Sequence, residues 1–196
     1  MKVIGLTGYI GSGKSTVSKM FASKGIYYFD SDAYVASLNT NKKVLREIQE
    51  YFPNCVVNNS LDKKQLKVEL FKNYNRSILI LEKIYHPFVY KKVKNLILIS
   101  KFLFRKAILL EVPLLFQSKI NELCDLTILV KCSKDIQIKR VLERSKGNMK
   151  MEDLEKIMKK QNQLNYDNML FSYVINTDET LEKIEYLVEN IIKEII

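Results

Sequence analysis

The chain has 196 residues, of which 47% are hydrophobic and 28% charged, and its formal net charge is +10. This length fits one domain with a helical insertion; the apolar share excludes a disordered chain, and only 6 Gly and 3 Pro exclude a collagen-like or low-complexity chain. Lys or Glu interrupts every apolar stretch, so the sequence predicts no membrane-spanning helix.

The charge and the cysteines narrow the class of protein further. The basic excess is mostly Lys spread along the chain, without a dense basic block, so it does not indicate nucleic-acid binding. Three widely spaced Cys without a Cys-x-x-Cys motif predict reduced thiols. We expect a soluble cytoplasmic protein with small-molecule partners and neither a nucleic acid nor a membrane among them. The sequence leaves the oligomeric state open.

Short apolar runs alternate with segments of helical periodicity along most of the chain. The predicted strands are residues 2–7, 26–29, 106–111, 126–130 and 173–176. The predicted helices between and after them are residues 15–24, 134–145, 151–163 and 179–194. Strands separated by helices form parallel sheets with right-handed crossovers. The sequence therefore predicts an α/β fold with a five-stranded parallel sheet and a ligand at the carboxyl ends of its strands.

Residues 33–101 form the exception, because they contain no convincing strand and predict a helical insertion. Within it we expect helices at 41–52 and 61–73, the second capped by Ser60 or Asp62. A pair of helices is expected across 75–101, broken or kinked near Pro87.

The strongest motif is Gly-Tyr-Ile-Gly-Ser-Gly-Lys-Ser at residues 8–15, which fits the P-loop pattern G-x-x-x-x-G-K-[ST]. Glycines allow backbone N–H groups to turn toward phosphate, and the following helix adds its positive N-terminal end. Lys14 is expected to bridge the β- and γ-phosphates, and Ser15 to bind Mg²⁺ through its hydroxyl. The loop residues predicted to hold nucleotide are Gly8, Gly11, Ser12, Gly13, Lys14 and Ser15.

Two carboxylates, Asp30 and Asp32, follow the second predicted strand. At the carboxyl edge of the sheet, one would accept a proton from an attacking hydroxyl and either would hold a magnesium-bound water. The alternative is a helix cap, since Asp-Ser-Asp before residue 33 is also good capping chemistry. The P-loop upstream favours the catalytic role.

Arg140 and Arg144 are four residues apart and therefore share a helix face. Arginines on a mobile flap stabilise the charge that spreads during phosphoryl transfer, and the polar segment around Gly147 resembles a lid hinge. The alternative is a plain surface ion pair with Glu143 or Glu152. Glu111 has two interpretations, a role near the metal or simple termination of its strand. A lone His beside a Pro, as at His86 and Pro87, is more often a packed residue than a catalyst.

Taken together, these segments resemble the dephospho-CoA kinase family. The resemblance rests on residues 4–16, 30–32, 81–87 and 110–116, and on Asp125, Gln137, Arg140, Arg144 and Gln161. The resemblance implies that ATP phosphorylates the ribose 3′-hydroxyl of dephospho-CoA, the last step of coenzyme A synthesis. It also implies a P-loop kinase core at 1–32, 102–139 and 164–196, a CoA-binding helical domain at 33–101 and a lid at 140–163.

The resemblance assigns roles to individual residues as well. Lys14, Ser15 and Thr16 would serve ATP and magnesium, and Asp32 would be the base on the 3′-hydroxyl. Arg140 would meet ATP with Arg144 beside it, and His86 would lie on the CoA side. The metal site predicted from the motifs themselves takes Ser15, Asp30 and Glu111.

The sequence departs from the family pattern at several positions. Tyr9 stands where a third glycine is usual, and the ending Asn176-Thr177-Asp178 lacks the usual Asn-x-Gly, which leaves adenine contacts there in doubt. Two alternative functions are another small-molecule kinase, differing only in acceptor, and a non-catalytic P-loop protein that binds nucleotide or RNA. The acid pair and the lid arginines argue against the second alternative.

Overall fold

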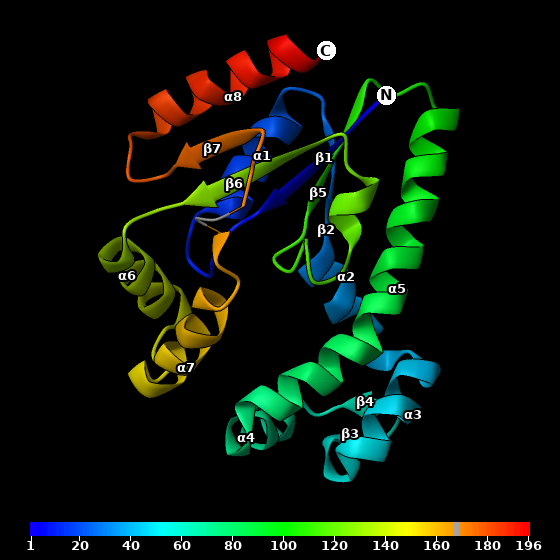
Figure 1. Cartoon of the computed structure of the whole chain (residues 1–196). Helices are drawn as coiled ribbons and strands as arrows, with labels where there is room; N and C mark the ends of the chain where they lie inside the picture. Colours follow the sequence, from blue (N-terminus) through cyan, green and yellow to red (C-terminus); the bar gives the residue numbers. More distant parts are fainter. Residues whose placement is uncertain (167–168) are drawn as a thin grey trace. The chain divides into compact units, whose positions relative to one another are not determined.

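The structure is a computed structural model that describes residues 1–166 and 169–196, and it divides into two compact units. One unit comprises Met1–Asp30 and Val93–Ile196, and the other comprises Ser31–Lys92. The first unit holds the large sheet and the P-loop (Figure 1). The second is mostly helical.

The large sheet has five parallel strands in the order β2-β5-β1-β6-β7, which confirms the predicted fold class. The strands are β1 (Lys2–Thr7), β2 (Tyr27–Asp30), β5 (Ala107–Glu111), β6 (Leu126–Lys131) and β7 (Tyr173–Asn176). Each lies within one residue of its predicted range. Since all five run in the same direction, the loops that follow β1, β2, β5, β6 and β7 emerge at one edge of the sheet.

Several helices and a short turn, together with the end of α5, complete the described part of this unit. They are α1 (Lys14–Ser23), α6 (Lys134–Ser145), α7 (Met151–Asn162), α8 (Leu181–Ile195) and the 3-10 turn η3 (Ile120–Leu123). The loop after β1 leads directly into α1. This connection places residues 8–13 at the carboxyl edge, next to the central strand of the sheet.

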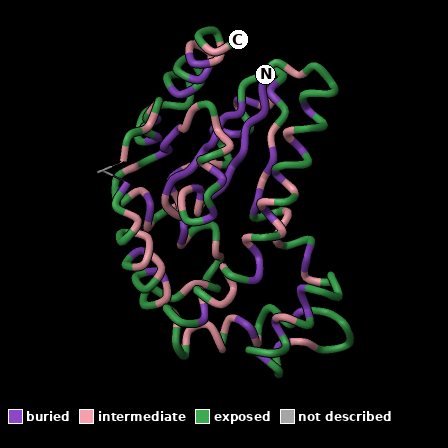
Figure 2. Tube along the Cα trace, turned by 45° about the vertical axis from the view of Figure 1, so that its right-hand side comes forward, coloured by how far each residue is buried: buried purple, intermediate pink, exposed green. Residues whose placement is uncertain are grey.

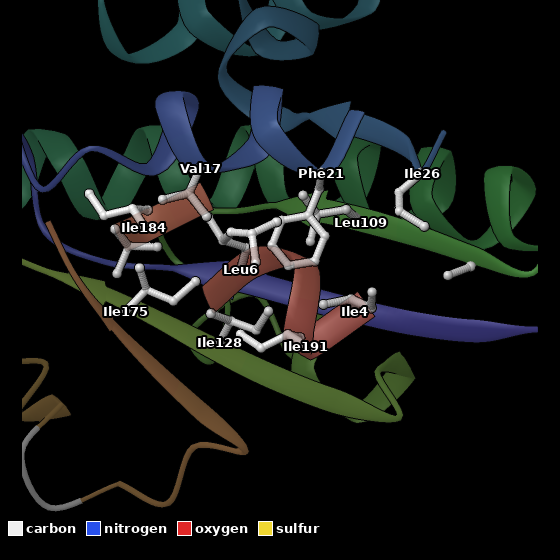
Figure 3. Packing of buried hydrophobic residues seen from close by; sticks show 13 residues of the cluster. Ile4, Leu6, Val17, Phe21, Ile26, Leu109, Ile128, Ile175, Ile184 and Ile191 are labelled. Atoms are coloured by element: carbon white, nitrogen blue, oxygen red, sulfur yellow. The ribbon is translucent and has the colours of Figure 1, made fainter. Parts of the chain in front are cut away.

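The main hydrophobic core lies between the sheet, α1 and α8. Side chains from strands and helices gather there (Figure 3), and the buried members labelled in that view include Leu6, Phe21, Ile128 and Ile191. Figure 2 shows the same strands as the buried centre of this unit. Burying one such side chain contributes about 1.5–3 kcal/mol. This packing holds α1, and with it the P-loop, against β1.

The C-terminus of α1 is set by Gly25. Ile26 N donates to Phe21 O at 3.2 Å and Gly25 N donates to Ala22 O at 3.0 Å, with Gly25 at φ +84°. This is the Schellman geometry, in which a left-handed residue ends the helix. Gly25 therefore ends α1.

The second unit is built from short helices around its own core. Its elements are α2 (Ser31–Ser37), η1 (Leu38–Thr40), α3 (Lys42–Tyr51), η2 (Pro53–Cys55), β3 (Val56–Val57), β4 (Ser60–Leu61), α4 (Lys63–Lys72) and most of α5 (Tyr74–Phe102). Of the two caps proposed for α4, the structure uses Asp62, whose carboxylate accepts from Lys64 N and Gln65 N.

Two predictions for this region were wrong. β3 and β4 pair as a small antiparallel hairpin whose turn residues Asn58 and Asn59 have φ of +50° and +59°. Strands of two residues are too short to produce an alternating pattern, although paired left-handed asparagines are typical of such turns.

The expected pair of helices across 75–101 is instead one helix, α5, with Pro87 inside it. An internal proline removes one hydrogen bond and costs about 3 kcal/mol. Buried Ile84, Tyr85 and Val89 flank Pro87 and stabilise the helix on both sides of it. In the described residues, neither α5 nor any other helix is long and apolar enough to cross a membrane.

Candidate active site

The P-loop joins β1 to α1, and two of its glycines are required by both backbone and space. Gly11 and Gly13 have φ of +75° and +92°, where side chains are strained. A Cβ on Gly11 would lie 2.8 Å from the carbonyl oxygen of Gln137, and one on Gly13 would lie 3.1 Å from the Thr177 side chain. The loop therefore fits closely against neighbouring elements only because these positions carry no side chain.

Two glutamine side chains hold the outer rim of the loop. Gln137 Nε2 donates to Ile10 O at 2.7 Å, and Ile10 N donates to Gln161 Oε1 at 2.8 Å. A peptide unit is planar and trans, so a carbonyl turned toward Gln137 directs the N–H of Gly11 to the opposite side. The sequence marked both glutamines only through the family resemblance. Only the structure shows that the two side chains hydrogen-bond to the loop and support it.

Thr177, in the loop after β7, holds the next peptide in the same way. Its hydroxyl Oγ1 donates to Ser12 O at 2.8 Å, which directs the N–H of Gly13 away from Thr177. Arg140 then donates to Thr177 twice, from NH1 to Oγ1 at 2.7 Å and from NH2 to the carbonyl oxygen at 2.8 Å. Thr177 is buried and connects the P-loop to the predicted lid arginine. Sequence reasoning missed it, and the only signal was the departure from Asn-x-Gly.

Lys14 bends back over the loop. Its ammonium Nζ donates to Gly8 O and Tyr9 O, each at 3.0 Å. Tyr9 is not among the residues with positive φ, and its ring packs against that of Tyr166 at a tilt, with centroids 4.9 Å apart. The substitution of the usual glycine by Tyr9 is therefore accommodated, and the positive charge of Lys14 lies at the mouth of the phosphate loop.

Ser15 and Glu111 meet at the carboxyl edge. Ser15 Oγ donates to Glu111 Oε1 at 2.9 Å. Glu111 ends β5, is 4% exposed, and its second oxygen Oε2 has no hydrogen-bond partner among the described residues. Burial raises the pKa of Glu111, the hydrogen bond from Ser15 opposes that rise, and the nearby charge of Asp30 adds to it. Asp30 stands opposite Glu111 on the adjacent strand β2.

These three side chains fit a magnesium ion. Mg²⁺ binds oxygen donors and usually keeps water and substrate phosphates as its other ligands. Ser15 supplies a hydroxyl, and Glu111 and Asp30 supply carboxylates. A buried carboxylate oxygen without a partner is costly unless a cation or donor satisfies it. Among the described residues, no group of three or more His, Cys, Asp or Glu is placed to hold a metal ion.

Comparison with known proteins decides the family. The family described as dephospho-CoA kinase matches residues 2–183. This chain belongs to the dephospho-CoA kinase family. A dephospho-CoA kinase from Fusobacterium nucleatum is 35% identical over 193 residues, covering 96% of this chain and 89% of that protein. As a member of the family, the chain is a kinase that uses ATP.

Solved structures agree with the fold. The crystal structure of TT1252 from Thermus thermophilus is 28% identical with a TM-score of 0.77, and the alignment covers 100% of this chain and 98% of that one. Dephospho-CoA kinase from Campylobacter jejuni gives a TM-score of 0.69 at 23% identity, covering 98% and 96% of the two chains. The second likeness shows that the kinase of this family and the present chain share a fold.

The remaining predicted site residues lie elsewhere. Thr16 is the third residue of α1, and Arg144 is exposed in the last turn of α6, one turn beyond Arg140. Asp32 and His86 belong to the helical unit. Asp32 is exposed in the first turn of α2, a position that suits helix capping as well as catalysis. His86 is half-buried on α5, and burial lowers its pKa, which favours the neutral imidazole.

Proposed function

We propose that this chain transfers the γ-phosphoryl group of ATP to the ribose 3′-hydroxyl of dephospho-CoA, the last step of coenzyme A biosynthesis. The observation that carries the phosphoryl-transfer chemistry is the hydrogen bond from Ser15 to the buried carboxylate of Glu111, beside a glycine loop whose carbonyls are bound from outside by Gln137 and Thr177. Membership of the dephospho-CoA kinase family supports the acceptor.

In this proposal the P-loop binds the phosphates of ATP. The N–H groups of Gly11 and Gly13 would face the β- and γ-phosphates, and Lys14 would leave its two carbonyl partners to pair with phosphate charge. The exchange costs little, because one set of hydrogen bonds replaces another. The orientation is set before ATP arrives, so it requires no reorganisation during the reaction.

Ser15, Asp30 and Glu111 would hold Mg²⁺. The ion, when bound, neutralises charge that develops on the phosphate oxygens. Burial raises the pKa of Glu111, and a cation beside the carboxylate would oppose that rise.

Asp32 would act as the general base. Its carboxylate would take the proton of the 3′-hydroxyl as the oxygen attacks the γ-phosphorus, and ADP would leave on the opposite side. The support is its place two residues after Asp30 and its exposure. Arg140, with Arg144 beside it, would stabilise the transferred group from the lid at 140–163.

Residues 33–101, with His86, would bind dephospho-CoA. The neutral state of His86 suits hydrogen bonding to substrate better than pairing with its phosphates. A cytoplasmic location belongs to the same proposal, and the free state of Cys55, Cys124 and Cys132 supports a reducing compartment.

An acceptor screen tests the proposal. The full chain with ATP and MgCl₂ is offered dephospho-CoA, AMP, CMP or shikimate, and transfer is followed with γ-labelled ATP. Label should appear on dephospho-CoA alone. Transfer to AMP, CMP or shikimate instead would favour another small-molecule kinase, and ATP binding without any transfer would favour a non-catalytic P-loop protein.

A further inference from the structure

The C-terminal end of α5 carries an exposed apolar surface at the amino edge of the sheet, the edge opposite the P-loop. Its members, which we call the α5 tip, are Leu98, Ile99, Phe102, Leu103 and Phe104, and each is at least half exposed. Phe102 is 81% exposed and Phe104 is 93% exposed. Figure 1 places this end of α5 and the turn into β5 beside the N-terminus, and Figure 2 shows it as exposed.

The inner face of the helix behind the α5 tip is packed against its own unit. Val93, Leu96 and Ser100 on that face are buried, at 0%, 7% and 0% exposure. The apolar side chains of the α5 tip lie outside this packing, and contiguous exposed apolar surface marks an interaction site. The outer face at the α5 tip therefore lacks a partner within its own unit.

The backbone conformation of Phe104 also indicates an external contact. Phe104 N donates to Lys101 O and Arg105 N donates to Ser100 O, each at 3.0 Å, so Phe104 occupies the left-handed position that ends the helix. Its φ is +52°. Glycine is preferred there, and a bulky residue is strained. A strained and almost fully exposed Phe contributes little to the fold, which is a reason to look for an external contact.

The segment that carries the α5 tip is positively charged. No acidic residue occurs between Glu82 and Glu111 in the sequence, whereas Lys94, Lys101 and Lys106 are exposed. Lys2 N donates to Lys106 O at 2.8 Å, which brings the N-terminus of β1 to the same place.

The chemistry of the α5 tip selects one occupant. A second copy of the chain would bring lysines against lysines. Projecting aromatic side chains flanked by Lys, whose long stems keep their charge at the surface, suit the headgroup region of an anionic bilayer. We propose that the α5 tip docks on anionic lipid membranes, with Phe102 and Phe104 inserted between headgroups and the lysines against lipid phosphates. This peripheral contact departs from the sequence-based expectation of no membrane partner.

The position of the α5 tip leaves the P-loop accessible during docking. The tip precedes β5 and lies at the amino edge of the sheet, whereas the P-loop follows β1 at the carboxyl edge. A strand of this length separates the two edges by about 20 Å. Membrane docking is therefore a property separate from phosphoryl transfer.

Vesicle flotation of the full chain tests the proposal. The wild-type chain should float with vesicles that mix phosphatidylcholine and phosphatidylglycerol, not with phosphatidylcholine alone, and added salt should weaken binding. The double variant Phe102→Ser with Phe104→Gly should bind about 10- to 100-fold more weakly, because it loses the favourable free energy of transferring Phe side chains out of water. Its melting temperature should not fall, because glycine suits residue 104, and its turnover in solution should be unchanged.

Matched controls separate this surface from general effects. Tyr186→Ser removes another exposed aromatic, 66% exposed on α8, and should float as the wild-type chain does. Lys101→Glu should weaken binding about tenfold, and Lys193→Glu, the same charge change on α8, should not. The proposal is overturned if the wild-type chain fails to float, if the double variant floats equally well, or if sedimentation shows a dimer that the double variant dissociates.

Discussion

Replacing Thr177 by valine exchanges one hydroxyl for a methyl group and leaves the rest of the side chain unchanged. Valine keeps the shape of threonine, so the volume beside Gly13 is preserved. The lost atom, Oγ1, donates to Ser12 O at 2.8 Å and accepts from Arg140 NH1 at 2.7 Å. The substitution therefore releases the Ser12 carbonyl, whose direction sets the N–H of Gly13, and loosens one of the two bonds that hold Arg140.

The magnitude follows from those two bonds. A hydrogen bond contributes about 0.5–1.5 kcal/mol net, and a bond to a charged group somewhat more. The added methyl group of valine offsets about 0.8 kcal/mol. A net loss of about 1.5 kcal/mol remains, which lowers the melting temperature of a chain of this size by about 3–6 °C. In catalysis, one misdirected N–H on phosphate should lower kcat/KM for ATP by about 10- to 100-fold.

Thermal unfolding and steady-state kinetics with ATP as the varied substrate measure the two effects. Thr177→Ser is the matched control, because it keeps the hydroxyl and loses the methyl group, and it should restore kcat/KM for ATP even if it melts earlier. A Thr177→Val enzyme that melts early but keeps its kcat/KM for ATP would limit Thr177 to a structural role and refute the reasoning.

Three further predictions concern the charged residues of the site. Lys14→Ala should cut turnover by about 10³-fold or more, since it removes charge stabilisation in the transition state, and near-normal turnover would contradict that role. Asp32→Asn should keep ATP binding, measured by calorimetry, while transfer falls by about 10²–10⁴-fold; if Asp30→Asn alone abolishes transfer and Asp32→Asn does not, the base is misassigned. Glu111→Gln should lower magnesium-dependent turnover yet raise the free energy of unfolding at neutral pH. The folded pKa of Glu111 is raised, so its favourable contribution to stability is present at acid pH and is lost as pH rises through the folded pKa. Urea unfolding in EDTA at several pH values measures this effect. The free energy of unfolding of Glu111→Gln should exceed that of the wild-type chain at neutral pH, and the difference should shrink toward acid pH. A difference that is the same at every pH would show that the charged form of Glu111 does not destabilise the fold.

Local chemistry explains what the sequence by itself determined. The glycine loop at 8–15 requires particular residue types at fixed spacing, and buried parallel strands require continuous apolar runs, so both are visible without a structure. The helix end at Gly25 and the cap of α4 at Asp62 are likewise set by neighbours in the chain. Family membership followed from several such segments together.

Contacts between distant segments were decided only by the tertiary structure. The hydrogen bonds from Gln137 and Thr177 to the loop carbonyls join residues more than a hundred positions apart, and no local pattern encodes them. The order of the strands and the buried, unpartnered Oε2 of Glu111 also depend on segments that are distant in the sequence. The continuity of α5 through Pro87 was also missed, because packing of the flanking residues outweighs the cost of one proline. The exposure of the α5 tip could not be predicted either. An apolar sequence shows that a side chain avoids water, but only the folded chain shows whether other residues cover it.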